Sequence, residues 1–378
     1  MFEDLPLELH EHIVALACTG FLGFDTGASV RLVSRYFATL AEPFRYVAVL
    51  LSDAHRIARL ANALKMPAYH NAVVHHLFLS LDFEPEGRHA ETPQIRYILC
   101  RVAPTLQSLI VLAESTDSHP VLRQVVHTVL NMQFPQLSYI TVGDASVING
   151  GPLPQRSQPL YPNLRYLHIV HNNAQTQVPL NFVVATPFLL RAGGDAPVHM
   201  RFSGVRFTGV CIRALRLFSG LMAKQELKRN DPALALDFMR LSSIWVIPES
   251  MRGRLVVQPV EVLPEVGRAM FAGNAGAAQE HFVAEIQALS RSCEESGATP
   301  ELVVLPPGPP RRRDDFLVEW RCVRDGVYDS LFLLPKPEPT EFLEPTRELA
   351  EFLEPKPEPT KARQEQPKSN RRRKAGRN

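Results

Sequence analysis

The sequence lacks any apolar run of the roughly 18 residues that a membrane-spanning helix requires. Its most apolar stretch, residues 180–190, is interrupted by Pro187. No charged segment followed by an apolar one opens the chain, so nothing predicts secretion. Cysteine is also scarce, with five scattered residues among 378. This odd, dispersed set predicts reduced thiols in the cytosol or nucleus and excludes a disulfide framework.

A large excess of charge is absent as well, because the net charge is only +2. Residues 335–360 hold seven Glu against three Lys or Arg, whereas residues 361–378 hold eight Lys or Arg against one Glu. Subtracting both segments leaves residues 1–334 at −1. The body therefore has no basic surplus that predicts nucleic-acid binding, and only weak binding by the tail is expected.

The first 46 residues predict two short amphipathic helices. Asp4 can cap a helix whose first turn contains Pro6, where the missing N–H costs nothing. Its apolar face consists of Leu9, Ile13 and Leu16. A second helix follows the caps Asp25 and Thr26 and ends before Pro43. Its apolar stripe consists of Val30, Val33, Phe37 and Leu40. Neither helix can bury its apolar face alone, so both need a partner surface.

This region resembles an F-box through its LPLEL opening at residues 5–9 and its LVSR block at residues 32–35. The resemblance implies docking on the Skp-type adaptor of a cullin–RING ubiquitin ligase. The residues that it would place against the adaptor are Leu5, Pro6, Leu9, Ile13, Val33, Ser34 and Phe37. A Trp common at the end of such motifs is absent here, where residues 43–46 read PFRY. A repeat scaffold with a degenerate F-box that binds no adaptor is therefore the second hypothesis.

A repeating pattern follows in which apolar residues occupy positions 1, 4 and 6 of a unit. It begins at Val74, Leu106, Leu137 and Leu164, so the starts lie 32, 31 and 27 residues apart. Helical stripes lie between these predicted strands, and strand, turn and helix at a steady period are typical of a solenoid. The pattern resembles irregular leucine-rich repeats. The predicted fold class is thus α/β, and an α/β layer with evenly spaced strands is the alternative.

Positions three and five of each unit should face outward on the concave side of the sheet, because side chains alternate along a strand. Aromatic residues among them are the expected anchors for a protein target. The predicted target-binding residues are His76, Phe78, Ser108, Ile110, Tyr139, Thr141, Tyr166, His168, Ser243 and Trp245.

Other elements follow from the same patterns. A linking helix is expected at residues 52–66, and the repeat fades between residues 175 and 235. A further strand is predicted at 241–246, a turn at 273–276 and a helix at 279–293. Residues 302–305 predict a strand, and residues 316–322 should cap the solenoid.

The end of the chain predicts disorder. Alternating prolines and a repeated Glu-Phe-Leu-Glu-Pro piece predict that residues 335–360 form a polar, polyproline-like spacer, with short docking motifs in the repeated pieces as the alternative. A basic cluster at Arg371, Arg372, Arg373 and Lys374 is a nuclear-import candidate, with a bland solvated end as the alternative. Three domains are expected: an F-box-like domain at residues 1–48, a solenoid at 49–325 and a tail at 326–378.

Candidate chemistry is sparse. Asp25-Thr26-Gly27 resembles the catalytic loop of retropepsin-type aspartic proteases, but such enzymes need paired aspartates and flanking strands. Histidine pairs lack the nearby cysteines of a zinc site, so no metal and no cofactor are expected. The sequence therefore predicts a non-catalytic substrate receptor of a ubiquitin ligase, cytoplasmic, nuclear or both. It would bind a Skp-type adaptor, a cullin and a protein target.

Overall fold

The structure is a computed structural model of the chain. It describes residues 5–19, 29–69, 72–81, 92–113, 119–143, 159–171, 188, 192, 198–205, 212, 215–216, 253–261, 272–297, 301–309 and 311–326. The chain divides into two units, residues 1–335 and residues 336–378, and every described residue belongs to the first. Within these ranges no helix is long and apolar enough to cross a membrane.

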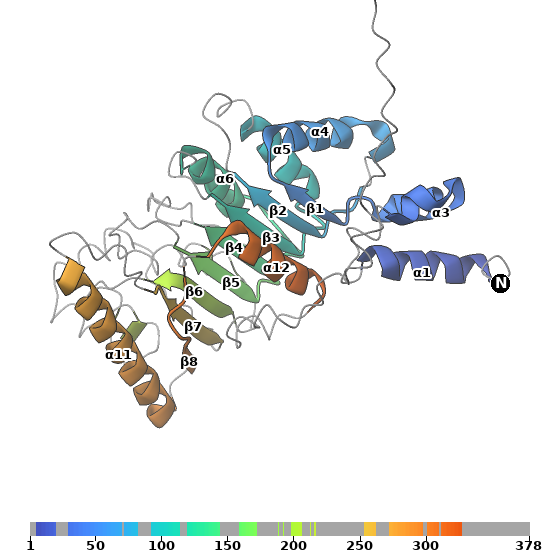
Figure 1. The fold of residues 1–378 in the computed structure, drawn as a ribbon. Coiled ribbons are helices and arrows are strands. Elements are labelled where there is room, and N and C mark those ends of the chain that lie inside the picture. The colour runs from blue at the N-terminus through green and yellow to red at the C-terminus, as the bar shows by residue number, and fades with distance from the viewer. Residues whose placement is uncertain are drawn as a thin grey trace, which may run out of the picture. The chain divides into compact units, whose positions relative to one another are not determined.

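Eight parallel strands form one open sheet whose strand order follows the sequence (Figure 1). Every neighbouring pair is parallel. The strands are β1 (Ala48–Leu51), β2 (His76–Ser80), β3 (Ser108–Leu112), β4 (Tyr139–Gly143), β5 (Tyr166–Val170), β6 (His199–Val205), β7 (Arg254–Pro259) and β8 (Glu301–Val304). The predicted α/β class is confirmed. The four strands expected from the repeat are β2 to β5.

One face of the sheet, here called the first face, is apolar. Its positions in register across the strands include Leu77, Leu109, Ile140, Leu167 and Met200. The first four are the fourth positions of the predicted units, and all five are buried in the main core. The alternation predicted from the sequence therefore assigns the strand side chains to the correct faces.

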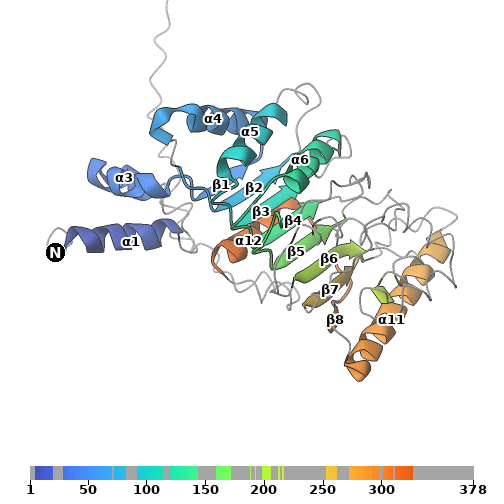
Figure 2. The ribbon, with the colours of Figure 1, turned by 180° about the vertical axis from the view of Figure 1, so that it is seen from behind.

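Among the helices whose bounds the structure describes, four contribute to this core. They are α4 (Ala54–Lys65), α5 (Thr92–Val102), α6 (His119–Asn131) and α11 (Ala272–Ser296). Ile57 of α4, Ile98 of α5, Val125 of α6 and Phe282 of α11 are all buried with the first face. Figure 2 shows the sheet from behind with its strands in order and α11 beside β8. These four helices all lie on the first face, so other described residues cover the opposite face.

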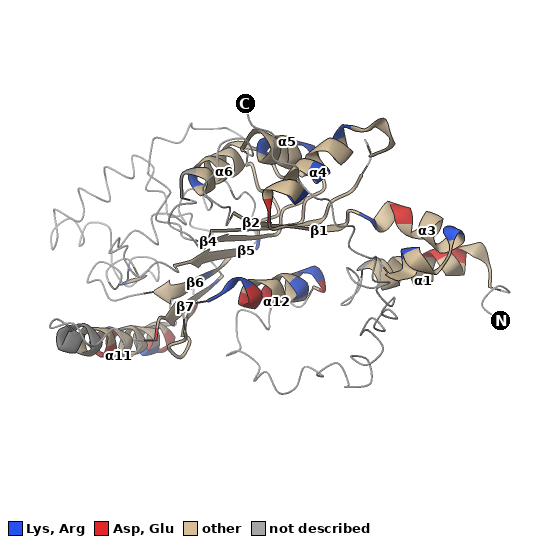
Figure 3. Cartoon of the chain, turned by 45° about the horizontal axis from the view of Figure 1, so that its top comes forward, with Lys and Arg blue, Asp and Glu red and all other residues tan. Residues whose placement is uncertain are grey.

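The opposite face, here called the second face, is covered by α12 (Arg313–Arg324). Figure 3 shows α12 and the helices α4 to α6 on opposite sides of the sheet. The buried side chains of α12 include Phe316, Trp320 and Val323, and they pack with Phe78, Ile110 and Tyr139. The expectation that residues 316–322 cap the end of the solenoid is wrong. The helix α12 contacts β2 and β3, which lie near the β1 edge of the sheet and not at its β8 end.

The N-terminal region contains α1 (Leu7–Thr19), a helical segment at residues 29–33 and α3 (Arg35–Ala41), followed by a 3-10 helix at Glu42–Phe44. Together these elements are called the hairpin. The second predicted helix is interrupted at Ser34, which is extended at φ −160° and accepts a hydrogen bond from the Phe37 N–H at 3.2 Å. The predicted single stripe is therefore wrong at this point, since Ser34 caps a new helix instead of continuing the old one.

Several other expectations are corrected. No strand was predicted where β1 lies, at the predicted boundary between the F-box-like domain and the solenoid. The sheet therefore begins 28 residues before β2, as the pairing of Ala48 with His76 shows. β6 and its pairing with β5 show that the sheet continues within residues 175–235. Residues 273–276 are the beginning of α11 and not a turn. The strand expected at residues 241–246 lies outside the described ranges.

Candidate functional site

The hairpin has its own small core. Val14, Cys18 and Ala41 are buried in it, and Phe37 and Leu40 pack against them. A hydrogen bond of 2.6 Å between His10 Nδ1 and the Tyr36 hydroxyl joins α1 to α3. An ion pair of 2.8 Å between Arg31 and Glu42 ties the helical segment to the end of α3. These contacts hold α1 and α3 together, and the other apolar side chains of the two helices take no part in them.

Those remaining apolar side chains face solvent. Leu32 is 86% exposed, Val33 68% and Leu9 47%. Of the nine large apolar side chains that are exposed in the described ranges, seven lie on the hairpin. They are Leu7, Leu9, Ile13, Leu16, Leu32, Val33 and Tyr36. Such a concentration on two short helices is typical of a surface that a partner covers.

The predicted adaptor-binding residues divide into two groups. Leu9, Ile13 and Val33 are exposed on the hairpin, as are Pro6 and Ser34, while Leu5 is half-buried. Phe37 is half-buried in the hairpin core and Ser34 caps α3, so both have structural roles inside the hairpin. The motif list omitted Leu7, Leu32 and Tyr36, which the hydrophobic pattern of the sequence could have included.

The predicted target-binding residues do lie together on the second face, but they are not open to solvent. His76, Phe78, Ser108, Ile110, Tyr139, Thr141 and His168 are all buried, and Tyr166 is half-buried. Ser243 and Trp245 lie outside the described ranges. The expectation of a bare concave face is wrong, because α12 packs over it. A target could not reach these side chains while α12 occupies this position.

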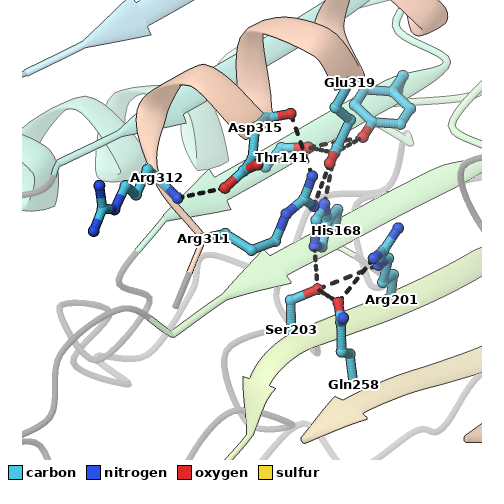
Figure 4. A network of polar contacts seen from close by, with 10 residues as sticks. Thr141, His168, Arg201, Ser203, Gln258, Arg311, Arg312, Asp315 and Glu319 are labelled. Atoms are coloured by element: carbon cyan, nitrogen blue, oxygen red, sulfur yellow. Dashed lines mark hydrogen bonds and ion pairs between the residues drawn. The ribbon is translucent and has the colours of Figure 1, made fainter. Parts of the chain in front are cut away.

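A network of buried polar groups lies between α12 and the second face (Figure 4). Its centre is the carboxylate of Glu319, a residue of α12 that is 1% exposed. One carboxylate oxygen accepts hydrogen bonds from the hydroxyl of Tyr139 and, at 3.3 Å, from that of Thr141. The same oxygen lies 2.6 Å from Nδ1 of His168, and the other oxygen accepts a hydrogen bond from Arg311.

The network continues along the strands beyond His168. Its Nε2 lies 2.9 Å from Oγ of Ser203, which also accepts a hydrogen bond of 3.2 Å from Nε of Arg201. Arg201 donates a second bond of 2.9 Å to the side-chain oxygen of Gln258. Thr141, His168 and Arg201 occupy matched positions on β4, β5 and β6, so the parallel register brings them side by side.

Burial and charge fix the protonation states within the network. Burial alone would raise the pKa of Glu319, but Arg311, His168 and Arg201 outweigh it and hold that pKa well below its usual range. Burial lowers the pKa of His168 to about 4 despite the carboxylate, since Arg201 and Arg311 also disfavour a further positive charge. At neutral pH a neutral His168 therefore donates its Nδ1–H to an ionised Glu319 and accepts from Ser203 at Nε2.

Glu319, His168 and Ser203 thus have the hydrogen-bond order of a hydrolase triad. A nucleophilic role requires that a substrate reach Ser203, whose side chain is fully buried. The acidic member resides on α12, the same helix that covers the other two. Moving α12 aside to admit a substrate would also remove the acid. The geometry therefore supports a docking role for the network and not acyl transfer.

The buried histidines predict a pH dependence of stability. Burial lowers the pKa of His76 to about 3 and that of His168 to about 4, whereas an unfolded histidine titrates near 6.5. Between those values the unfolded state binds protons that the folded state does not. Stability should therefore be fully present above about pH 6.5 and fall toward pH 4, by up to about 1.4 kcal/mol per pH unit for each histidine.

Urea unfolding between pH 4 and pH 7 measures this slope. The variant His76→Asn should lose about half of it near pH 5. His75→Asn is the control, because burial lowers the pKa of His75 without the strong shift seen at its neighbour. A wild-type slope of zero across this interval would show that His76 and His168 are not held neutral in the folded chain.

Other candidate chemistry finds little support. No group of three or more possible metal ligands occurs among the residues that the structure describes. Asp25 of the protease-like string lies outside the described ranges, and residues 29–33 after it are helical. Glu319 was missed by the sequence reasoning, although it interrupts an apolar stripe formed by Phe316, Trp320 and Val323. That interruption is the signal from which a buried carboxylate could have been inferred.

No family model, curated protein or solved structure matches this chain. At the level of class it is an α/β protein with an open, all-parallel sheet. What it does is therefore inferred from its own geometry and from the F-box resemblance of residues 5–46.

Proposed function

We propose that the chain is a non-catalytic substrate receptor of a cullin–RING ubiquitin ligase. In this proposal the hairpin binds a Skp-type adaptor, and the repeat-bearing sheet domain holds a protein target. The supporting observation is the solvent-facing apolar surface of the hairpin, on which Leu9, Ile13 and Val33 of the F-box-like motif lie. The ubiquitin transfer itself belongs to the associated subunits, so no catalytic residue is assigned here.

Physical chemistry explains why this surface favours a partner. The hairpin core already contains Val14, Phe37 and Leu40, so the outward side chains cannot be there to hold the hairpin together. Each fully buried leucine or valine contributes about 1.5–3 kcal/mol, so several of them at one interface support stable binding. If the same side chains stay in water, this stabilising free energy is not gained, and the exposed apolar surface favours aggregation.

The attachment of the hairpin to the sheet domain suits a receptor. The Arg45 guanidinium lies over the rings of Tyr46 and Tyr69, at 5.3 Å and 5.6 Å from their centroids. It also donates a hydrogen bond of 3.0 Å to the Tyr69 hydroxyl. The Tyr46 and Tyr69 rings meet edge to face at 5.3 Å. These contacts would hold a target at a defined position with respect to the ligase.

Affinity purification from cells treated with a proteasome inhibitor tests the proposal. We expect the adaptor and a cullin among the recovered proteins, with targets that accumulate on inhibition. Recovery of targets without adaptor or cullin would instead favour the second candidate, a scaffold whose degenerate F-box binds no adaptor. A casein assay with a pepstatin control tests the distant protease alternative, which requires Asp25.

The amino-acid sequence of the tail, which lies outside the described residues, gives a separate prediction. Five of the eight lysines lie beyond residue 334, and a long polar segment can reach a ubiquitin-charged enzyme more easily than a folded surface. Deleting residues 335–378 should therefore lengthen the half-life of the protein. It should also shift the protein toward the cytoplasm, since Arg371–Lys374 would be lost.

Cycloheximide chase and imaging of tagged chains measure both effects. A variant with Arg371, Arg372, Arg373 and Lys374 changed to serine is the matched control, because it retains the other tail lysines. It should alter location with little effect on half-life. Equal turnover and equal distribution after the full deletion would show that the tail is an inert spacer.

A further inference from the structure

The two faces of the sheet differ in a way that bears on what they bind. The first face is apolar throughout, as a permanently packed face should be. The second face carries the buried polar side chains of His76, Ser108, Thr141, His168 and Arg201. Polar layers pack less favourably than apolar ones, but they are also less costly to expose to water. A face of this kind suits a cover that can be exchanged.

Three donors of the second face converge on one point. The hydroxyls of Tyr139 and Thr141 and the Nδ1–H of His168 all bond a single oxygen of Glu319. All three donors belong to the strands β4 and β5, so the sheet itself holds a site for a carboxylate. Apolar rings surround that site, since Phe316 lies beside His168 at 6.1 Å and Trp320 beside Phe78 at 5.9 Å.

The helix α12 is attached in a manner that permits exchange. It follows Pro306, Pro307 and Pro309, and Gly308 fixes the start of this segment to β7 by a hydrogen bond to the Pro259 carbonyl. Its fit is also incomplete. The indole N–H of Trp320 is buried, and no residue within the described ranges accepts its hydrogen bond. Burying an unpaired donor costs free energy, so an occupant without such a donor would fit the second face better than α12 does.

We propose that the second face is a binding site for an amphipathic helix that carries a carboxylate between aromatic side chains, and that α12 is the chain's own occupant of this site. This inference rests on the proposed function, since it names the class of target segment that the receptor would take. The pattern to be recognised is the one α12 displays, an aromatic residue at i, an acid at i+3 and an aromatic residue at i+4. A target helix of this pattern would displace α12, and Tyr139, Thr141 and His168 would bond its carboxylate.

Binding of a fluorescent peptide with the sequence of residues 311–326 to the full-length chain tests the inference. The chain variant Glu319→Lys should free the site, because a lysine there would face Arg201 and Arg311. We expect this variant to bind the peptide at least about tenfold more tightly than the wild-type chain, whose site is occupied. A peptide carrying Glu319→Gln should bind at least about tenfold more weakly than the wild-type peptide. A scrambled peptide is the control.

A second variant in which α12 is released from the second face, here called a freed chain like Glu319→Lys, is the control in case the first variant misfolds. Phe316→Ser with Trp320→Ser weakens the apolar contacts of α12 without adding charge, and circular dichroism verifies the fold of both variants. Thr141→Val, introduced into either freed chain, should lower affinity by about threefold to tenfold, since it removes one donor and preserves shape. Absence of peptide binding by both freed chains, or equal binding of the Glu and Gln peptides, would overturn the inference.

The assay contains no adaptor, so its outcome is independent of the hairpin. If the peptide does not bind, adaptor docking can still be observed and the proposed ligase role is unaffected. If the peptide binds but the chain recovers no adaptor, the carboxylate site stands and the ligase role fails.

Discussion

Replacing Leu9 or Val33 by aspartate should abolish co-purification of the adaptor and the cullin while the chain stays folded. Both side chains are exposed on the hairpin, so water can solvate the introduced charge in the free protein. In a complex it would be buried against the adaptor without a partner, which costs several kcal/mol, on the order of a thousandfold or more in affinity. Quantitative pull-down with purified adaptor measures the loss.

Val318→Asp is a matched control for this experiment. Val318 is an apolar residue that is 45% exposed, similar to Leu9, but it lies on α12 and not on the hairpin. It should leave adaptor binding at the wild-type level. Phe37→Asp is expected to differ from both, because Phe37 packs in the hairpin core and its replacement should unfold the hairpin. Wild-type binding by Leu9→Asp and Val33→Asp would remove the hairpin surface from consideration as the docking site.

Replacing Glu319 by alanine should release α12 from the second face. The change leaves the Tyr139 hydroxyl and the Nδ1–H of His168 without their acceptor, whereas the Thr141 hydroxyl can still donate to Tyr139 at 3.0 Å. It also leaves Arg311 without its ion-pair partner. Removing one member of a buried charged pair typically costs about 3–5 kcal/mol. The side chain of Trp320, now 3% exposed, would then enter water.

Tryptophan fluorescence reports that release directly. In a Trp245→Phe background only Trp320 emits, and Glu319→Ala should shift its emission to longer wavelength at neutral pH. Glu294→Ala is the control, since Glu294 is an exposed acid on α11. Glu319→Gln should give an intermediate shift, because the amide preserves the shape but not the charge. An unshifted spectrum for Glu319→Ala would show that apolar contacts alone hold α12 in place.

Much of the sheet could be predicted because its information is local. The apolar residues at positions 4 and 6 of each unit, such as Leu77 and Leu79, identify the first face through strand alternation alone. The strand β1 was missed because it precedes the first recognisable unit and its sequence AVLL is short. The strand β6 was missed because His199, Arg201 and Ser203 interrupt its apolar pattern, and all three are explained by partners on other strands.

The cover over the second face could not be predicted from local patterns. Glu319 meets Tyr139 across 180 residues of sequence and His168 across 151. Periodicity locates α12 as a helix but does not state which surface it covers. For the same reason, the sequence predicts that the polar second-face residues form an open binding surface. In this structure their immediate partner is instead the chain's own helix α12.

Co-expression of the full chain with a Skp-type adaptor tests most directly whether the hairpin is an adaptor-binding surface. Size-exclusion chromatography with light scattering should show a complex of one chain with one adaptor. Hydrogen exchange should show new protection in α1 and in residues 29–41, with the strands unchanged. A chain that elutes without the adaptor, and whose hairpin exchanges as it does alone, would contradict the account.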